Sequence, residues 1–154
     1  MNIIICGAGK VGFSISKQLS AQGHSVTVID QSSEDIKKIN DTQDVKGIVG
    51  RATLPTVLEN AGAEKTDMII AVTRNDETKM IVCQLASSLF NVSKKDLEKY
   101  FTGPTAAAIS SDPISTAKIL TKFSKSNDKL KIVAGFMDGK ILDEKEVSVI
   151  ATLP

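Results

Sequence analysis

The stretch M-N-I-I-I-C-G-A-G-K-V-G, residues 1–12, decides the fold of this chain of 154 residues. Its uncharged apolar run ends at Cys6, and three glycines follow in the pattern G-x-G-x-x-G. A short continuous apolar run is typical of a parallel strand that is buried on both faces. Beyond it, Val11, Ile15 and Leu19 repeat four residues apart, as on one face of a helix. The sequence therefore predicts a strand, a tight glycine turn and a helix, in that order.

The same alternation of strand and helix continues along the chain. Strands are expected at residues 1–6, 25–29, 45–49, 68–72, 105–110 and 130–137. Helices are expected at residues 11–22, from 33 onward, and at 56–61, 76–90, 94–101, 113–125 and 144–152. Successive strand–helix units with right-handed crossovers build a parallel, doubly wound sheet. We therefore expect an α/β, Rossmann-like fold of three layers around a mostly parallel sheet of about six strands.

The three glycines stand where a dinucleotide-binding loop needs them. Gly7 permits the tight turn, Gly9 lets the backbone approach a pyrophosphate, and Gly12 lets the helix pack on the strand. Asp30 ends the next strand, 18 residues beyond Gly12, where an acid accepts hydrogen bonds from the adenosine ribose. Its charge repels a 2′-phosphate, which favours NAD over NADP. A Rossmann domain that has lost its ligand would keep the same pattern.

A second part of the crevice is expected after the fourth strand, where T-R-N-D-E occupies residues 73–77. Thr73 would bond a second ribose, and Arg74 would face a phosphate. The segment suits a helix N-terminus equally well, since Asn75 or Asp76 is a good N-cap. Both interpretations stay open, because one residue can do both.

Residues for catalysis are not evident. His24, the sole histidine, lies in the turn Q-G-H-S, at the end of the sheet opposite the expected crevice. We find no paired carboxylates, no nucleophile elbow and no Cys/His metal spacing. A dehydrogenase would also need a substrate domain, for which 154 residues leave no room. The sequence therefore indicates a binding module without a metal, and not an enzyme.

Composition and charge exclude several further classes. Lys+Arg 19 against Asp+Glu 18 gives no global field that would attract nucleic acid or an anionic membrane. Cys6 and Cys83 both sit among apolar neighbours, as buried thiols do. The chain has no apolar run of the ~18 residues that a transmembrane helix needs, and no signal peptide is apparent. A cytoplasmic protein is expected.

Residues 1–92 contain several motifs that are typical of one protein family: M-N-I-I-I-C-G-A-G-K-V-G, V-T-V-I-D, I-V-G-R-A-T, V-L-E-N-A-G-A-E-K-T-D-M-I-I-A-V-T and N-D-E-T-K-M. In these the chain resembles the N-terminal regulator-of-conductance domain of Trk-type potassium-uptake regulatory proteins. The resemblance implies a dimerising cytosolic domain that binds NAD or NADH and acts on the membrane subunit of a potassium transporter. Related regulators bind ATP or another adenosine phosphate in the same crevice, which leaves that alternative open. The nucleotide contacts that it implies are Gly7, Ala8, Gly9, Lys10, Val11, Asp30, Thr73 and Arg74.

Two departures from that family concern the nucleotide. Arg51 stands where the family often has an acid after the glycine of its third-strand motif. The fourth helix of the family continues into an I-A-R-x-R strand, whereas S-K-K runs here into D-L-E-K-Y. The arginine that helps to hold the nucleotide in that family is therefore missing.

A different set of motifs fills residues 96–154: L-E-K-Y-F-T-G-P-T-A-A-A-I-S, D-P-I-S-T-A-K-I-L-T-K-F-S-K, L-K-I-V-A-G-F-M-D-G-K-I-L and V-I-A-T-L-P. They resemble the second half of the globular domain of the ribosomal stalk-base protein family, which implies contact with rRNA. The basic first half of that domain and the helix that carries the stalk are absent. Five lysines mark either a residual RNA face or a solvated helix face: Lys118, Lys122, Lys125, Lys129 and Lys131.

Together the two resemblances predict a chimera with a junction near residues 91–96. Residues 1–92 would be the NAD-binding Rossmann half. Residues 93–154 would be a strand–helix–strand segment packed onto the same sheet. Three functions follow: an NAD(H)-binding regulatory domain related to potassium uptake, a ribosome-associated rRNA-binding fragment, or an engineered hybrid without a physiological role.

Overall fold

The computed structural model covers residues 1–154 and describes all of them except 74–75, 78–79, 82–104, 129 and 138–139. It divides into two compact units, Met1–Ile109 and Ser110–Pro154. The junction expected near residues 91–96 lies outside the described residues, as do most of the helix expected at 76–90 and all of that at 94–101.

A five-stranded sheet forms the centre of the first unit, in the order β3-β2-β1-β4-β5. Parallel pairing joins β1 to β2, β1 to β4 and β2 to β3. The strands are β1 (Asn2–Cys6), β2 (Ser25–Asp30), β3 (Lys46–Val49), β4 (Met68–Ala71) and β5 (Ala107–Ser110). The chain order reverses between β1 and β4, and in open α/β sheets ligands bind beyond the carboxyl ends of the strands at such a switch point.

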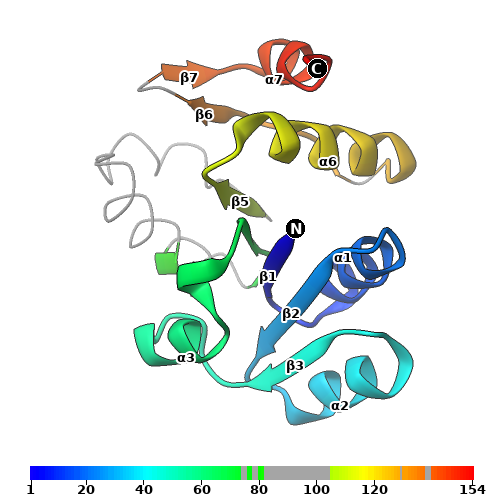
Figure 1. The fold of residues 1–154 in the computed structure, drawn as a ribbon, viewed down its shortest axis with the longest axis vertical. Coiled ribbons are helices and arrows are strands. Elements are labelled where there is room, and N and C mark those ends of the chain that lie inside the picture. Colours follow the sequence, from blue (N-terminus) through cyan, green and yellow to red (C-terminus); the bar gives the residue numbers. More distant parts are fainter. Residues whose placement is uncertain (74–75, 78–79, 82–104, 129, 138–139) are drawn as a thin grey trace. The chain divides into compact units, whose positions relative to one another are not determined.

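Helices cover both faces of this sheet. Figure 1 shows α1 and α2 on one side of the central strands and α3 on the other. The elements are α1 (Lys10–Ala21), α2 (Ser33–Thr42), α3 (Pro55–Asn60) and the 3-10 turn η1 (Ala63–Lys65). The expected three-layer, Rossmann-like α/β architecture is thereby confirmed.

Apolar strand residues that are buried on both faces hold the layers together. On one face, side chains of β1, β2 and β4 cluster with residues of the α3 region: Ile4, Cys6, Ile29, Ile69, Ala71, Ala52 and Leu58. Ile3 and Ile5 alternate with these and are buried on the face that α1 and α2 cover. Burying one such isoleucine contributes about 1.5–3 kcal/mol. This explains why the uninterrupted apolar run at the N-terminus forms the central strand.

Cys6 lies within this core at 0% exposure, and burial raises the pKa of its thiol to about 12. Because the thiolate is the reactive form, we expect Cys6 to stay unmodified when the native protein is incubated with iodoacetamide at about pH 8. It should react fully once the protein is unfolded in urea. Peptide mass spectrometry resolves Cys6 from Cys83, and rapid labelling of native Cys6 would contradict its burial.

A buried polar contact links α1 to the end of α2. Ser16 is fully buried, and its Oγ lies 3.0 Å from the carbonyl oxygen of Phe13 and 2.7 Å from Oε1 of Gln43. The Gln43 amide donates in turn to the Phe13 carbonyl at 3.1 Å. These contacts fix the direction of α1, whose N-terminus follows the glycine loop.

The second unit contains α6 (Pro113–Ser126), β6 (Gly135–Met137), β7 (Lys140–Leu142) and α7 (Glu144–Ile150). The expected sixth strand at 130–137 is wrong in extent and in partner. Only Gly135–Met137 form a strand, and they pair antiparallel with β7 in a separate two-stranded sheet. A hairpin satisfies the backbone of both strands locally, without a place in the larger sheet. The expected return pairing of residues 141–142 is confirmed.

Side-chain caps define the two helices of this unit. Asp112 accepts a hydrogen bond from the Ser115 N–H at 3.0 Å, as the sequence predicted for the start of α6. Hydrogen bonds from Ser115 lower the pKa of the Asp112 carboxyl below its usual value. Asp143 and Glu146 form a reciprocal capping box at the start of α7.

Candidate functional site

The glycine loop after β1 leaves no room for side chains at its first and third glycines. Gly7 has a φ of +116°, and a Cβ there would lie 2.9 Å from the carbonyl oxygen of Val72. A Cβ on Gly12 would lie 1.9 Å from the carbonyl oxygen of Gly7. The loop is therefore packed against the end of β4 and the first turn of α1, as the roles predicted for these two glycines require.

The middle glycine faces open space. A Cβ on Gly9 would meet nothing within 4 Å. Gly9 is the N-cap residue of α1, where no side chain caps the helix and the first turn carries no acid. Ser32 caps α2, Asp112 caps α6 and Asp143 caps α7, whereas the short helix α3 lacks a side-chain cap as α1 does. Since the first N–H groups of a helix have no acceptor within the helix, this end of α1 is suited to an anion.

Asp30 joins the glycine loop to the start of α2. Its Oδ2 accepts a hydrogen bond from the N–H of Ala8 at 2.7 Å, and its Oδ1 accepts one from the N–H of Ser32 at 2.8 Å. The residue is half-buried. Each carboxylate oxygen has more than one acceptor site, so both can still accept from a ribose hydroxyl. The sequence predicted a ligand contact for Asp30 and missed its role in holding the loop.

A further contact at this edge of the sheet was not predicted. The Gln31 amide Nε2 donates a hydrogen bond to Oε1 of Glu77 at 3.0 Å. Gln31 directly follows β2, and Glu77 lies beyond β4. No sequence pattern pairs a glutamine and a glutamate 46 residues apart, and only the strand order brings them together.

The predicted site residues gather at the carboxyl ends of the central strands wherever they are described. Residues 7–12 follow β1, Asp30 ends β2, and Thr73 follows β4. Ala8 is buried, Lys10 is exposed, and Val11 is 48% exposed. Arg74 lies outside the described residues. Within the part of the chain that the structure describes, no three His, Cys, Asp or Glu side chains are grouped as metal ligands.

His24 lies at the opposite edge of the sheet, as expected. It directly precedes β2, and its Nδ1 is 3.4 Å from the amino group of Met1. Partial burial, and then the positive charge of that amino group, lower the pKa of its imidazole. His24 therefore lies at the opposite end of the strands from the glycine loop.

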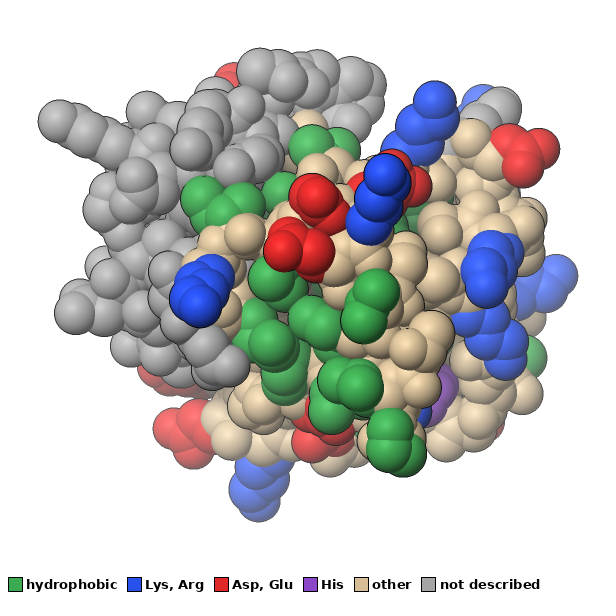
Figure 2. Space-filling model, turned by 90° about the horizontal axis from the view of Figure 1, so that it is seen from above, with side chains coloured by type: hydrophobic (Ala, Val, Ile, Leu, Met, Phe, Trp, Pro, Cys, Tyr) green, Lys and Arg blue, Asp and Glu red, His purple; other side chains and the backbone are tan. Residues whose placement is uncertain are grey.

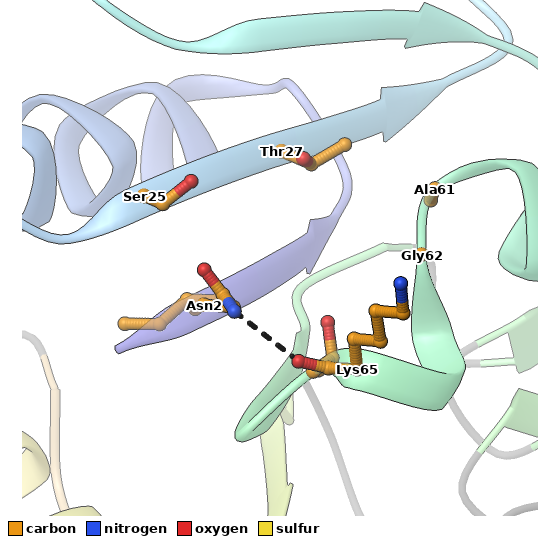
Figure 3. A pocket seen from close by; sticks show the side chains of 8 residues that line it. Asn2, Ser25, Thr27, Ala61, Gly62 and Lys65 are labelled. Atoms are coloured by element: carbon orange, nitrogen blue, oxygen red, sulfur yellow. Dashed lines mark hydrogen bonds between the residues drawn. The ribbon is translucent and has the colours of Figure 1, made fainter.

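A shallow pocket also opens at this opposite edge (Figure 3). Asn2, Ser25 and Thr27 line it, and the side-chain amide of Asn2 donates to the Lys65 carbonyl at 3.3 Å. Its volume of about 160 Å³ is smaller than the usual range for ligand sites. It does not suit a dinucleotide.

The second unit exposes both lysines and apolar side chains. Lys118, Lys122 and Lys125 are exposed at helical spacing on α6, and Lys131 is exposed beyond it. Among the residues of this unit that the structure describes, four large apolar side chains are more than 40% exposed: Val133, Ile141, Val149 and Leu153. Figure 2 shows a face of the molecule on which hydrophobic side chains gather with acidic and basic ones around them.

Comparisons with known proteins match two families. Residues 3–98 match the family model of the TrkA-N domain. The Trk system potassium uptake protein TrkA of Azorhizobium caulinodans is 46% identical over 95 residues, which are 62% of this chain and 21% of that protein. Large ribosomal subunit protein uL10 of Dechloromonas aromatica is 32% identical over 116 residues, which cover 72% of this chain and 70% of that protein. A match of 116 residues cannot fit after residue 98, so the two matches overlap.

A solved structure shares the fold. The structure titled Shewanella denitrificans Kef CTD in AMP bound form superposes with a TM-score of 0.50, covers 84% of both chains and is 20% identical. This chain spans about a fifth of the length of the TrkA relatives that it matches. No helix among the described residues has the length and apolar character needed to cross a membrane.

Proposed function

Because this chain belongs to the TrkA-N domain family through residues 3–98, and also to the family of large ribosomal subunit protein uL10, we propose that it is a chimera whose first unit binds NAD or NADH. This unit acts as a regulatory domain of potassium uptake and carries out no reaction of its own. Its partner is the membrane subunit of a potassium transporter, which it contacts as a homodimer on the cytoplasmic side.

One observation carries the proposal: the uncapped N-terminus of α1 lies beside the carboxylate of Asp30. The first turn offers N–H donors to a pyrophosphate, and Gly9 leaves open space for it. Asp30 offers acceptors to the adenosine ribose and is fixed in place by the N–H groups of Ala8 and Ser32. Thr73, which follows β4, is the proposed contact to the second ribose, and Arg74 is proposed to face a phosphate. ATP or another adenosine phosphate is the alternative ligand.

Calorimetric titration of the purified chain with NADH tests this function. We expect micromolar affinity, and a loss of about tenfold or more in Asp30→Ala. The variant removes the ribose acceptor and also leaves the Ala8 and Ser32 N–H groups without their partner. Asp41→Ala removes an equal charge from an exposed position at the far end of α2 and should bind NADH as the wild type does. A folded wild type that gives no heat would exclude the function.

The exposed lysines of α6 favour a second candidate, an rRNA-binding protein. Lys118, Lys122 and Lys125 are spaced to lie on one side of the helix, where phosphate groups could meet them. Binding of an rRNA fragment whose affinity falls steeply with salt would support this candidate. NADH binding that is lost in Asp30→Ala supports the first. A folded chain that binds neither ligand would be a hybrid without a physiological role.

A further inference from the structure

The hydrogen bond between Gln31 and Glu77 crosses the carboxyl end of the central strand. Gln31 follows β2, Glu77 lies beyond β4, and β1 is between these two strands. The glycine loop begins at the same end of β1. A ligand that runs from Asp30 over the loop toward β4 therefore passes the carboxylate of Glu77.

Two carboxylates thus flank one site for an anion. Asp30 ends β2 and Glu77 follows β4, while the glycine loop and the uncapped N-terminus of α1 follow β1, which lies between these two strands in the sheet. Gln31 holds Glu77 by its Oε1, which leaves Oε2 and the remaining acceptor sites for a ligand. The arrangement matches a ligand that is anionic in its middle and carries hydroxyl groups at both ends.

We propose that Glu77 is a specificity-determining residue that selects a dinucleotide over a nucleoside triphosphate at the proposed nucleotide site. This inference rests on the proposed function, since it assumes that the glycine loop binds a pyrophosphate. With the adenosine ribose at Asp30, a dinucleotide places its second ribose toward Glu77, where hydroxyl groups donate to the carboxylate. A triphosphate places its terminal phosphate there, and two like charges repel each other.

The test is a pair of titrations, with NADH and with ATP, on the wild type and on Glu77→Gln. The amide has nearly the same shape as the carboxylate, and its oxygen can still accept from Gln31. Removal of the charge should strengthen ATP binding about fivefold and weaken NADH binding about twofold. The ratio of the two affinities then shifts about tenfold toward ATP. Glu77→Ala, measured in parallel, should shift the ratio in the same direction.

Glu64→Gln is the matched control. It removes an equal charge from an exposed position in η1, at the opposite edge of the sheet, and should leave both affinities unchanged. If NADH binds and neither Glu77 variant changes the ratio, the inference is overturned while the proposed function stands. A wild type that prefers ATP would also overturn it. If the wild type binds neither nucleotide, the proposed function fails, and the specificity inference fails with it.

Discussion

Gly12→Ala is expected to lower the free energy of unfolding of the first unit by about 3 kcal/mol or more. The new Cβ would stand 1.9 Å from the carbonyl oxygen of Gly7 and 2.8 Å from its carbonyl carbon. Both are backbone atoms of the loop itself, so no flexible side chain can move aside. To relieve the clash, α1 must move away from β1, and apolar residues of the face beneath it lose their contacts.

Hydrogen exchange measures the loss of stability strand by strand and therefore shows whether the loss occurs in the first unit. Amide protection of β1 and β4 should fall strongly in Gly12→Ala, because these strands lie at the centre of the first unit. Gly23→Ala is a control for the loss of a glycine without a clash, although its φ of +82° adds some backbone strain. Unchanged protection of β1 in Gly12→Ala would show that the close approach of α1 to the loop is incorrect.

Gly9→Val is expected to reduce the affinity for NADH about a hundredfold or more while the fold is retained. Its main effect is thus on binding, whereas that of Gly12→Ala is on stability. A Cβ at Gly9 meets nothing within 4 Å, and the φ of −64° suits any residue. The branched side chain would instead fill the space that a pyrophosphate needs, and would shield the first N–H groups of α1. Loss of a good N-cap residue should lower stability by only about 1 kcal/mol.

Titration with NADH, together with thermal unfolding of the same samples, separates the two effects. Gly9→Ala adds a smaller group at the same position and should reduce affinity less than valine does. A valine variant that is folded and still binds NADH with unchanged affinity would refute pyrophosphate binding at this loop. Binding lost only together with the fold would show that Gly9 has a structural role.

The first unit was predictable from sequence because its signals are local. The apolar run ending at Cys6 is typical of a strand buried on both faces, and the glycines directly after it, before a helical pattern, favour the strand–turn–helix unit of a Rossmann fold. Ser33 and Pro113 likewise mark helix starts that the structure confirms within one residue. Where backbone geometry and burial follow from adjacent residues, the type of the element and its starting residue were predicted to within about one residue.

The hairpin of the second unit shows where local signals are insufficient. The apolar residues 130–137 suit a strand, yet their pattern does not specify the neighbouring strand. Pairing with β7 depends on the register that sets Gly135 opposite Leu142. The sequence therefore predicted a strand at the right place and assigned it to the wrong sheet.

In the candidate site, too, some features follow from local sequence patterns and others do not. The positions of Gly9 and Asp30 follow from a spacing pattern, whereas the hydrogen bonds of Asp30 to the N–H groups of Ala8 and Ser32 depend on the path of the loop. The contact between Gln31 and Glu77 depends on a strand order that places β2 and β4 on the two sides of β1. Such contacts arise from topology, which no local pattern encodes.

The burial of Cys6 has a consequence for the response of this domain to oxidative stress. Cys6 is fully buried, and burial raises the pKa of its thiol to about 12, so we expect peroxides and glutathione disulfide to leave the strand that leads into the glycine loop unmodified. If the domain binds NAD or NADH as proposed, oxidative conditions would affect this strand only indirectly. They would change the ratio of oxidised to reduced coenzyme, and the coenzyme binds at the loop that follows the strand. The metabolic state of the cell would then act on β1 and its loop without covalent damage to the protein.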